Sequence, residues 1–134
     1  DASHALGASY KTKKIGNCEF SEACVFSFHP VKMITTGEGG AVTSNNKKII
    51  NKIRMLREHG IKKNIADTNS KYEPWEYDQV YLGYNFRITD FQCALGLSQL
   101  KKLKTFVKKR NQITEAYKKY LTDYPVVFQK INNN

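Results

Sequence analysis

Apolar residues gather in two short runs in the first third of the chain. The run "ACVFSF" (23–28) is rich in apolar and aromatic residues, which is typical of a buried strand. The run "GGAVTS" (39–44) follows a glycine turn and predicts a second short strand. Residues 4–21 indicate short extended pieces joined by turns at Gly7, at "KTKK" and at Gly16-Asn17. We therefore expect strands and turns in this part of the chain.

A helical period begins after these runs. The segment "NKKIINKIRMLREHG" predicts a helix that starts near Asn45, and Gly60 is expected to cap its carboxyl end. Its apolar positions share one side of such a helix: Ile49, Ile50, Ile53 and Leu56. Residues 62–82 contain Pro74 and have no helical period, which predicts a long loop with a short extended stretch near Tyr81.

A second helical region follows at "NFRITDFQCALGLSQL". Thr89 with Gln92 three residues later fits a capping box, so Thr89 is the expected N-cap. The helix, or pair of helices, is predicted to continue to about Leu121, and "YPVVF" then favours the first strand of a further unit. The organisation we expect is a unit over 1–88, a helical connection over 89–122 and the start of another unit over 123–134.

The composition is that of an ordinary globular protein. The chain has 134 residues, of which 40% are hydrophobic and 25% charged, enough for one modest core and unlike a disordered protein. No apolar stretch reaches the roughly 18 residues that span a bilayer, and no signal peptide is visible. Cys18, Cys24 and Cys93 are odd in number and lack metal-ligand spacing, which indicates free thiols in a reducing compartment. We therefore expect a cytoplasmic protein with no membrane partner.

The net charge of +10 favours an anionic partner and is unevenly distributed. Between residues 101 and 119 there are eight basic residues against one acid, Glu115, and apolar residues recur near helical spacing through the same region. The pattern favours a surface helix with an apolar stripe inward and lysines outward, and a nucleic-acid contact surface is the alternative. Aromatic residues do not interleave with the basic ones, as a stacking platform for bases would require, so nucleic acid is the less favoured partner.

Lys32 differs from the other lysines because it follows an apolar strand and precedes a glycine-rich turn, "TTGEGG". Ligands bind at the carboxyl ends of strands in α/β sheets, and a lysine of lowered pKa there can attack a carbonyl. The turn glycines permit close approach of a planar ligand, and Ser27 offers a hydroxyl to a phosphate. These residues alone leave open whether Lys32 is such a nucleophile or an ordinary lysine whose stem packs on apolar surface.

Several quoted pieces together carry a family resemblance. "DASHALGA", "SFHPVK", "TTGEGGAV", "LREHG" and "GYNFRITDFQCALGLSQLKKL" occur in this order. Over residues 1–125 the chain resembles the pyridoxal-phosphate-dependent sugar-nucleotide aminotransferases of the DegT/StrS type. The residues of these motifs are most similar to those of family members in the pseudaminic-acid pathway. The resemblance implies an α/β fold: part of the large domain of a fold-type I transferase, with a mixed, mostly parallel sheet and flanking helices, plus the long connecting helix.

The resemblance also implies roles for five residues. Lys32 would form the Schiff base with pyridoxal 5'-phosphate and shuttle the proton as general base and acid. Asp1 matches the carboxylate that faces the pyridine nitrogen, and His4 matches the residue beside the ring. Ser27 would bind the phosphate, and Asn85 would reach across a homodimer interface to the partner's phosphate. Without the family motifs, Asp1 would be a solvated end residue, His4 an exposed turn residue and Asn85 part of a turn.

The implied reaction moves an amino group from glutamate to a 4-keto-6-deoxy sugar on a UDP carrier, in the synthesis of a bacterial surface amino sugar. Family members run to several hundred residues, so this chain resembles a fragment, and we expect the activity to belong to the intact protein. The alternatives are a catalytically silent fragment of such an enzyme and, less favoured, a basic nucleic-acid-binding module. The resemblance leaves Arg87 unassigned, favours a packed role for His29 and expects Glu38 to shape the turn.

Overall fold

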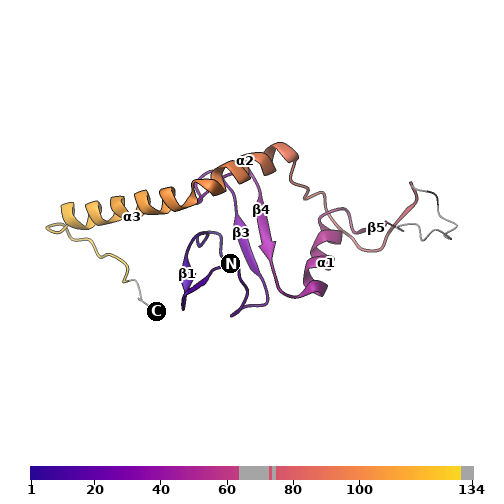
Figure 1. The fold of residues 1–134 in the computed structure, drawn as a ribbon, viewed down its shortest axis with the longest axis horizontal. Helices are drawn as coiled ribbons and strands as arrows, with labels where there is room; N and C mark the ends of the chain where they lie inside the picture. Colours follow the sequence, from indigo (N-terminus) through magenta and orange to yellow (C-terminus); the bar gives the residue numbers. More distant parts are fainter. Residues whose placement is uncertain (64–72, 74, 131–134) are drawn as a thin grey trace.

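A computed structural model describes residues 1–63, 73 and 75–130 of the chain. It combines helices with short strands, which confirms the α/β class (Figure 1). The strands are β1 (Ser9–Tyr10), β2 (Lys13–Lys14), β3 (Cys24–Ser27), β4 (Gly40–Thr43), β5 (Ile61–Lys63) and β6 (Tyr77–Gln79). The helices are α1 (Lys47–Leu56), α2 (Asp90–Lys101) and α3 (Leu103–Tyr120).

The two predicted apolar strands pair with each other. β3 and β4 form an antiparallel ladder in which Cys24 faces Thr43 and Ser27 faces Gly40. β1 pairs with β2 and β5 with β6, also antiparallel, so the mostly parallel sheet expected for the large domain does not occur among the described strands. A parallel neighbour needs a crossover, usually a helix, whereas residues 28–39 form a loop that returns beside the strand it leaves.

Helix α1 begins where its cap lies. The Asn46 side chain accepts a hydrogen bond from the Lys48 amide at 2.9 Å, one residue after the expected start. The predicted glycine cap is wrong, because the helix ends at Leu56 with Arg57 as its C-cap. Gly60 instead has φ of 69° and donates its N–H to the carbonyl of Met55, so it turns the chain back toward the helix end.

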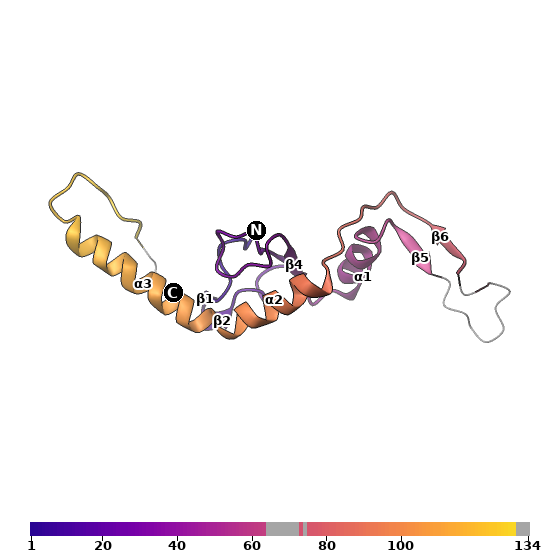
Figure 2. The same cartoon turned by 90° about the horizontal axis from the view of Figure 1, so that it is seen from above.

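The predicted capping box is confirmed at the start of α2. Thr89 Oγ1 accepts from the Gln92 amide at 3.3 Å, and Gln92 Oε1 accepts from the Thr89 amide at 2.9 Å. Lys102 lies between α2 and α3 and belongs to neither helix, so the helical region is a pair of helices that ends at Tyr120. The two helices form one long rod that passes over the β3–β4 hairpin (Figure 2). Residues 124–128 form no strand, because nothing in the described chain pairs with them.

The loop expected over 62–82 is partly a hairpin. Ile61 faces Gln79 and Lys63 faces Tyr77 across β5 and β6, so an extended stretch does lie near Tyr81, and it ends at Gln79. The part of the expected loop at 64–72 and 74 lies outside the described residues.

The core within the described residues is small. Five of these residues are buried: Gly60, and four with side chains, whose exposed fractions are 6% for Ala2, 6% for Phe26, 4% for Ile34 and 3% for Thr36. The apolar stripe expected along the helical rod is mostly uncovered, and Leu97, for example, is 64% exposed. None of the helices in the described part of the chain has the length and apolar content needed to cross a bilayer.

Candidate functional site

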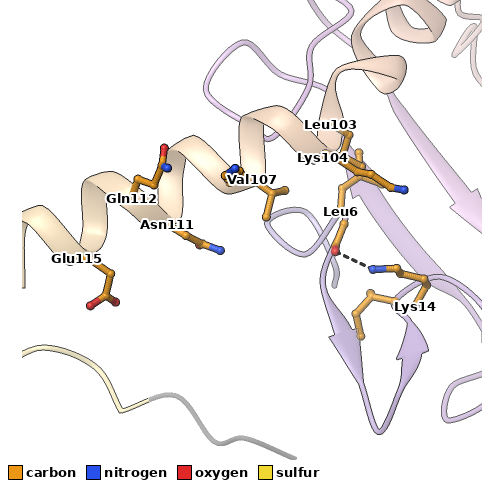
Figure 3. A pocket seen from close by; sticks show the side chains of 11 residues that line it. Leu6, Lys14, Leu103, Lys104, Val107, Asn111, Gln112 and Glu115 are labelled. Atoms are coloured by element: carbon orange, nitrogen blue, oxygen red, sulfur yellow. Dashed lines mark hydrogen bonds between the residues drawn. The ribbon is translucent and has the colours of Figure 1, made fainter.

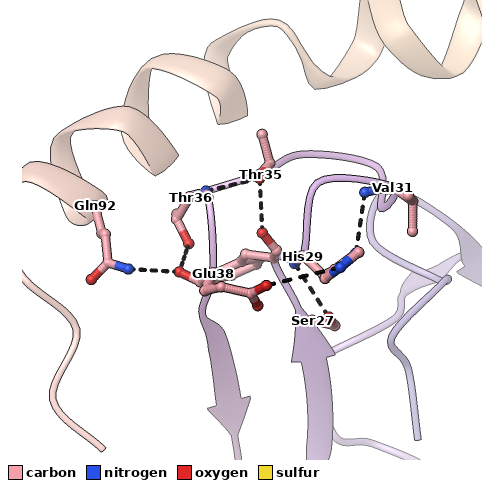
Figure 4. Close-up of polar contacts among 9 residues, drawn as sticks. Ser27, His29, Val31, Thr35, Thr36, Glu38 and Gln92 are labelled. Carbon is pink, nitrogen blue, oxygen red and sulfur yellow. Dashed lines mark hydrogen bonds and ion pairs between the residues drawn. The ribbon is translucent and has the colours of Figure 1, made fainter.

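The loop that carries Lys32 leaves β3 at Ser27 and returns to β4 at Gly40. Its neck is closed by two backbone hydrogen bonds, from the Phe28 amide to the Gly39 carbonyl at 2.8 Å and from the Thr36 amide to the Phe28 carbonyl at 3.0 Å. Thr35 Oγ1 also donates to the Phe28 carbonyl at 3.0 Å (Figure 4). The loop is therefore held as a defined structure although most of it lies on the surface.

Lys32 lies at a turn in this loop and contacts two distant segments. Its amide donates to the His29 carbonyl at 3.0 Å, which closes the turn. Its Nζ atom lies 2.7 Å from His4 Nε2, and its carbonyl accepts from Arg110 Nη2 of α3 at 3.2 Å. The side chain is half-buried. The amine is thus directed toward the segment at the start of the chain, 28 residues away.

That first segment lies beside β3. The Ala2 amide donates to the Val25 carbonyl at 2.8 Å, and the side chain of Ala2 is buried. Asp1 is exposed, and its Oδ1 atom accepts from the Ser3 amide at 2.8 Å. Two contacts, Ala2 to β3 and His4 to Lys32, therefore fasten residues 1–4 to the strand and its loop.

Ser27 is the last residue of β3 and begins the loop. Its Oγ atom accepts a hydrogen bond from the His29 amide at 3.3 Å, an arrangement visible in Figure 4. A hydroxyl has one donor and two acceptor positions, so this contact leaves the O–H of Ser27 free to donate.

Asn85 lies apart from the other four predicted residues. It is exposed and forms a β-bridge with Glu58, just after α1. The neighbouring Tyr84 donates its amide to the Leu56 carbonyl at 2.8 Å and accepts from the His59 amide at 3.0 Å. Within the described residues no hydrogen bond joins Asn85 to the Lys32 loop.

Sequence reasoning missed the contact that joins the loop to α2. Gln92 Nε2 donates to the Glu38 carbonyl at 2.9 Å, and Thr36 Oγ1 donates to the same carbonyl at 2.6 Å. Glu38 therefore shapes the turn through its carbonyl, while its carboxylate lies 3.9 Å from His29 Nε2. The capping box identified Gln92, but nothing local indicated a partner 54 residues away.

Two cavities flank this region. One, of about 880 Å³, lies between α3 and the segment from Leu6 to Ile15, with Lys104 and Lys108 on its helix side (Figure 3). The other, of about 920 Å³, lies between the β3–β4 hairpin, α1 and residues 86–92. None of the five predicted site residues lines either cavity, so their roles stay predictions.

The chemistry of the predicted donor set fits pyridoxal phosphate. Lys32 supplies a primary amine held by an imidazole and bound in no ion pair within the described residues. Ser27 keeps an O–H donor for a phosphate oxygen, and Asp1 keeps its Oδ2 atom for a protonated ring nitrogen. These three groups and His4 come from one strand end, its loop and the segment fastened to both.

Comparison with protein families gives a match over the whole chain. The model of the DegT/DnrJ/EryC1/StrS aminotransferase family matches residues 1–134. The UDP-4-amino-4,6-dideoxy-N-acetyl-beta-L-altrosamine transaminase of Campylobacter jejuni is 53% identical over 119 residues, 89% of this chain and 29% of that protein. The enzyme of the same name from Helicobacter pylori is 42% identical over 125 residues, 93% of this chain and 31% of its own length.

Solved structures agree with this match. Helicobacter pylori PseC, an aminotransferase involved in the biosynthesis of pseudoaminic acid, superposes with a TM-score of 0.79 at 42% identity, over 93% of this chain and 31% of that one. The PLP-form of a sugar aminotransferase from Streptococcus pneumoniae, Spr1654, superposes with a TM-score of 0.76 at 29% identity, over 97% of this chain and 32% of that one. The chain thus spans about a third of the length of these relatives.

Proposed function

Because the chain belongs to the DegT/DnrJ/EryC1/StrS aminotransferase family, we propose that it supplies the lysine-bearing part of a sugar-nucleotide aminotransferase. The proposed reaction transfers the amino group of glutamate to a 4-keto-6-deoxy sugar on UDP, for a surface sugar of the pseudaminic-acid type. We assign residues 1–88 to the cofactor domain, 89–122 to the connecting helices and 123–134 to the start of the small domain, and we place the enzyme in the cytoplasm.

The contact between Lys32 Nζ and His4 Nε2 at 2.7 Å carries this proposal. Pyridoxal phosphate, when bound, supplies an aldehyde that takes up amino groups and a ring that withdraws electrons from the reacting carbon. Lys32 is the primary amine that this loop directs toward His4, the residue that would lie beside the ring. While protonated, the amine can only donate, so His4 Nε2 would accept its hydrogen bond and fix its direction.

Ser27 and Asp1 would anchor opposite ends of the cofactor. The free O–H of Ser27 would donate to a phosphate oxygen, a charge-assisted bond that is stronger than a neutral one. The Asp1 carboxylate would hold a proton on the ring nitrogen, because an anion within about 4–6 Å favours a charged partner. The Ser3 amide already orients that carboxylate through its Oδ1 atom.

Asn85 would complete the site of a second copy. Its position beside Glu58, away from the Lys32 loop of its own chain, suits a residue that serves a neighbouring subunit. The backbone bonds around Tyr84 hold the segment against the end of α1, so Asn85 would be presented from a supported backbone.

Borohydride reduction tests the proposal. The full-length protein that carries this chain would be loaded with pyridoxal phosphate and reduced, and the modified peptide identified by mass spectrometry. We expect the modification on Lys32 and its loss in Lys32→Ala, whereas Lys109→Ala on the exposed face of α3 keeps it. His4→Ala should retain attachment but slow it, because the amine loses its orienting partner. Attachment to another lysine in the wild-type protein would refute the assignment.

Substrate assays separate the finer points. With a UDP-linked 4-keto-6-deoxy sugar, glutamate should yield the amino sugar and aspartate should not. If the cofactor attaches to Lys32 but no amino group is transferred from glutamate, the assignment of Lys32 stands and the assignment of glutamate as amino donor is refuted.

A further inference from the structure

The loop between β2 and β3 folds around one residue of the neighbouring strand, Thr43. Thr43 Oγ1 donates to the Gly16 carbonyl at 2.8 Å. Cys18 Sγ donates to the Thr43 carbonyl at 3.3 Å and lies 3.4 Å from Thr43 Oγ1. The loop is also held by Asn45, whose Nδ2 donates to the Asn17 carbonyl at 2.9 Å. The thiol of Cys18 is therefore fixed at the outer end of the β3–β4 hairpin.

A second thiol lies at the same end of the hairpin. Cys24 is the first residue of β3, and its direct cross-strand partner is Thr43, the residue that Cys18 contacts. Cys24 Sγ lies 3.4 Å from Ser21 Oγ. Both cysteines are free and half-buried. Five residues separate them in sequence, and the fold places both beside Thr43.

The surroundings of Cys24 favour its thiolate. Hydrogen bonding from the Ser21 hydroxyl is the main cause that lowers the pKa of Cys24, with further hydrogen bonding from Cys18 and the Gly16 backbone, against a raising effect of partial burial. The thiolate is the form that attacks peroxides and disulfides. Cys93 offers a contrast within the chain, because it is exposed on α2 and its side chain has no hydrogen bond within the described residues.

We propose that Cys18 and Cys24 form a reversible oxidation site that closes to a disulfide when a peroxide is the oxidant. In the first step Cys24 sulfur attacks one oxygen of hydrogen peroxide. An S–O bond forms, the O–O bond breaks, and the departing hydroxide takes up a proton to become water. The sulfur, now a sulfenic acid, has lost two electrons and the peroxide has gained them.

In the second step Cys18 sulfur attacks the sulfenic sulfur of Cys24. The S–S bond forms, the S–O bond breaks, and the hydroxide leaves with the thiol proton of Cys18 as water. Two thiols and one hydrogen peroxide thus give one disulfide and two waters. In this step Cys18 gives up weak S–H hydrogen bonds, to the carbonyls of Thr43 and Gly16. A dithiol such as dithiothreitol reverses the reaction by exchange.

The site adjoins the predicted cofactor region. Val25, next after Cys24, accepts the hydrogen bond that fastens Ala2 to β3. A disulfide would tie the loop to the first residue of this strand, so oxidation would act on the segment that carries Asp1 and His4. This inference is independent of the proposed aminotransfer, because it rests on thiols that have no part in it.

Peptide mapping tests the proposal on the full-length protein. The reduced protein would be treated with one equivalent of hydrogen peroxide, blocked with N-ethylmaleimide in denaturant and digested. Trypsin releases both cysteines in one peptide, residues 15–32, and a protease specific for glutamate cuts between them at Glu19 and Glu22. We expect two peptides joined by a disulfide, lighter by two hydrogen atoms than the free pair, while Cys93 carries the blocking group.

Variants and denaturant supply the controls. Cys18→Ser should leave Cys24 as a sulfenic acid that dimedone traps, and Cys93→Ser should behave as wild type. If the fold positions the pair, the disulfide should form about tenfold faster in the native protein than in guanidinium chloride. The same rate in guanidinium, no Cys18–Cys24 linkage, or oxidation of Cys93 ahead of the pair would each overturn the proposal. The peptide map of the wild-type protein and the comparison in guanidinium chloride test the proposal even if a variant fails to fold.

Discussion

The chain exposes far more surface than a compact protein of its mass, and this leads to a prediction about residues 1–134 produced alone. Its accessible surface is 11,339 Å² at 15.4 kDa. Folded monomers of this mass expose about 7,200 Å², so the excess is about 4,100 Å². The long rod of α2 and α3, which passes beyond the hairpin in Figure 2, is one visible source of this excess.

The excess surface corresponds to a large missing stabilisation. If about 55–60% of it is apolar, as on average protein surfaces, about 2,400 Å² of apolar area lacks a partner. At about 25 cal/mol per Å², covering this area would contribute at most about 60 kcal/mol. The net stability of a folded domain is only about 5–15 kcal/mol. Residues 1–134 alone therefore lack the burial that a stable native state needs.

The assay compares residues 1–134 with the full-length protein. Urea titration followed by circular dichroism should give no cooperative transition for residues 1–134, and the dye ANS should bind strongly to its exposed apolar surface. The full-length protein should unfold cooperatively and bind little dye. A monomer of residues 1–134 that unfolds in a single transition, with a free energy of unfolding above about 5 kcal/mol, would refute the reasoning.

Three further predictions use the full-length protein. Thr89→Ala should lower the free energy of unfolding by about 1 kcal/mol in urea titrations because it removes the α2 cap, while Thr89→Ser should keep it; equal losses would contradict the cap. Gly83→Ala should cost about 1–3 kcal/mol because its Cβ would meet the Leu56 carbonyl oxygen at 2.6 Å. Gly37→Ala should lower the free energy of unfolding by less, because a Cβ at this position, although φ is 82°, meets nothing within 4 Å. A larger loss for Gly37→Ala than for Gly83→Ala would contradict the close backbone contact at Gly83. Ser21→Ala should raise the pKa of Cys24 and move its iodoacetamide reaction to higher pH, and an unmoved profile would argue against the hydroxyl.

Features carried by neighbouring residues could be predicted from the sequence. The capping box needs only Thr89 and Gln92, three residues apart, and the structure has both of its hydrogen bonds. The strands at 24–27 and 40–43 follow from apolar runs between turns, although their antiparallel pairing was not among the predictions. The start of α1 was nearly correct for the same reason, since Asn46 caps it through its own side chain.

Features that join distant residues could not be predicted in this way. The predicted glycine cap assumed that the conformation of Gly60 depends only on the helix before it. In the structure Gly60 lies against Gly83 and Tyr81, because two backbones cross closely there and only glycine leaves room. The pairing of β5 with β6 and the bond from Gln92 to Glu38 likewise depend on contacts that no local pattern encodes.

In the candidate site, too, the part set by neighbouring residues could be predicted and the part set by distant residues could not. A strand followed by glycines places the backbone of Lys32 at the end of the β3–β4 hairpin, but it does not decide whether the amine points to solvent. The structure decides this through His4, 28 residues away, while Arg110 of α3 holds the Lys32 carbonyl from another side. The direction of the amine therefore depends on both ends of the chain. It follows that a substitution in α3 far from any cofactor, such as Arg110→Ala, should slow borohydride-trapped attachment at Lys32 without removing it, whereas Lys109→Ala should not.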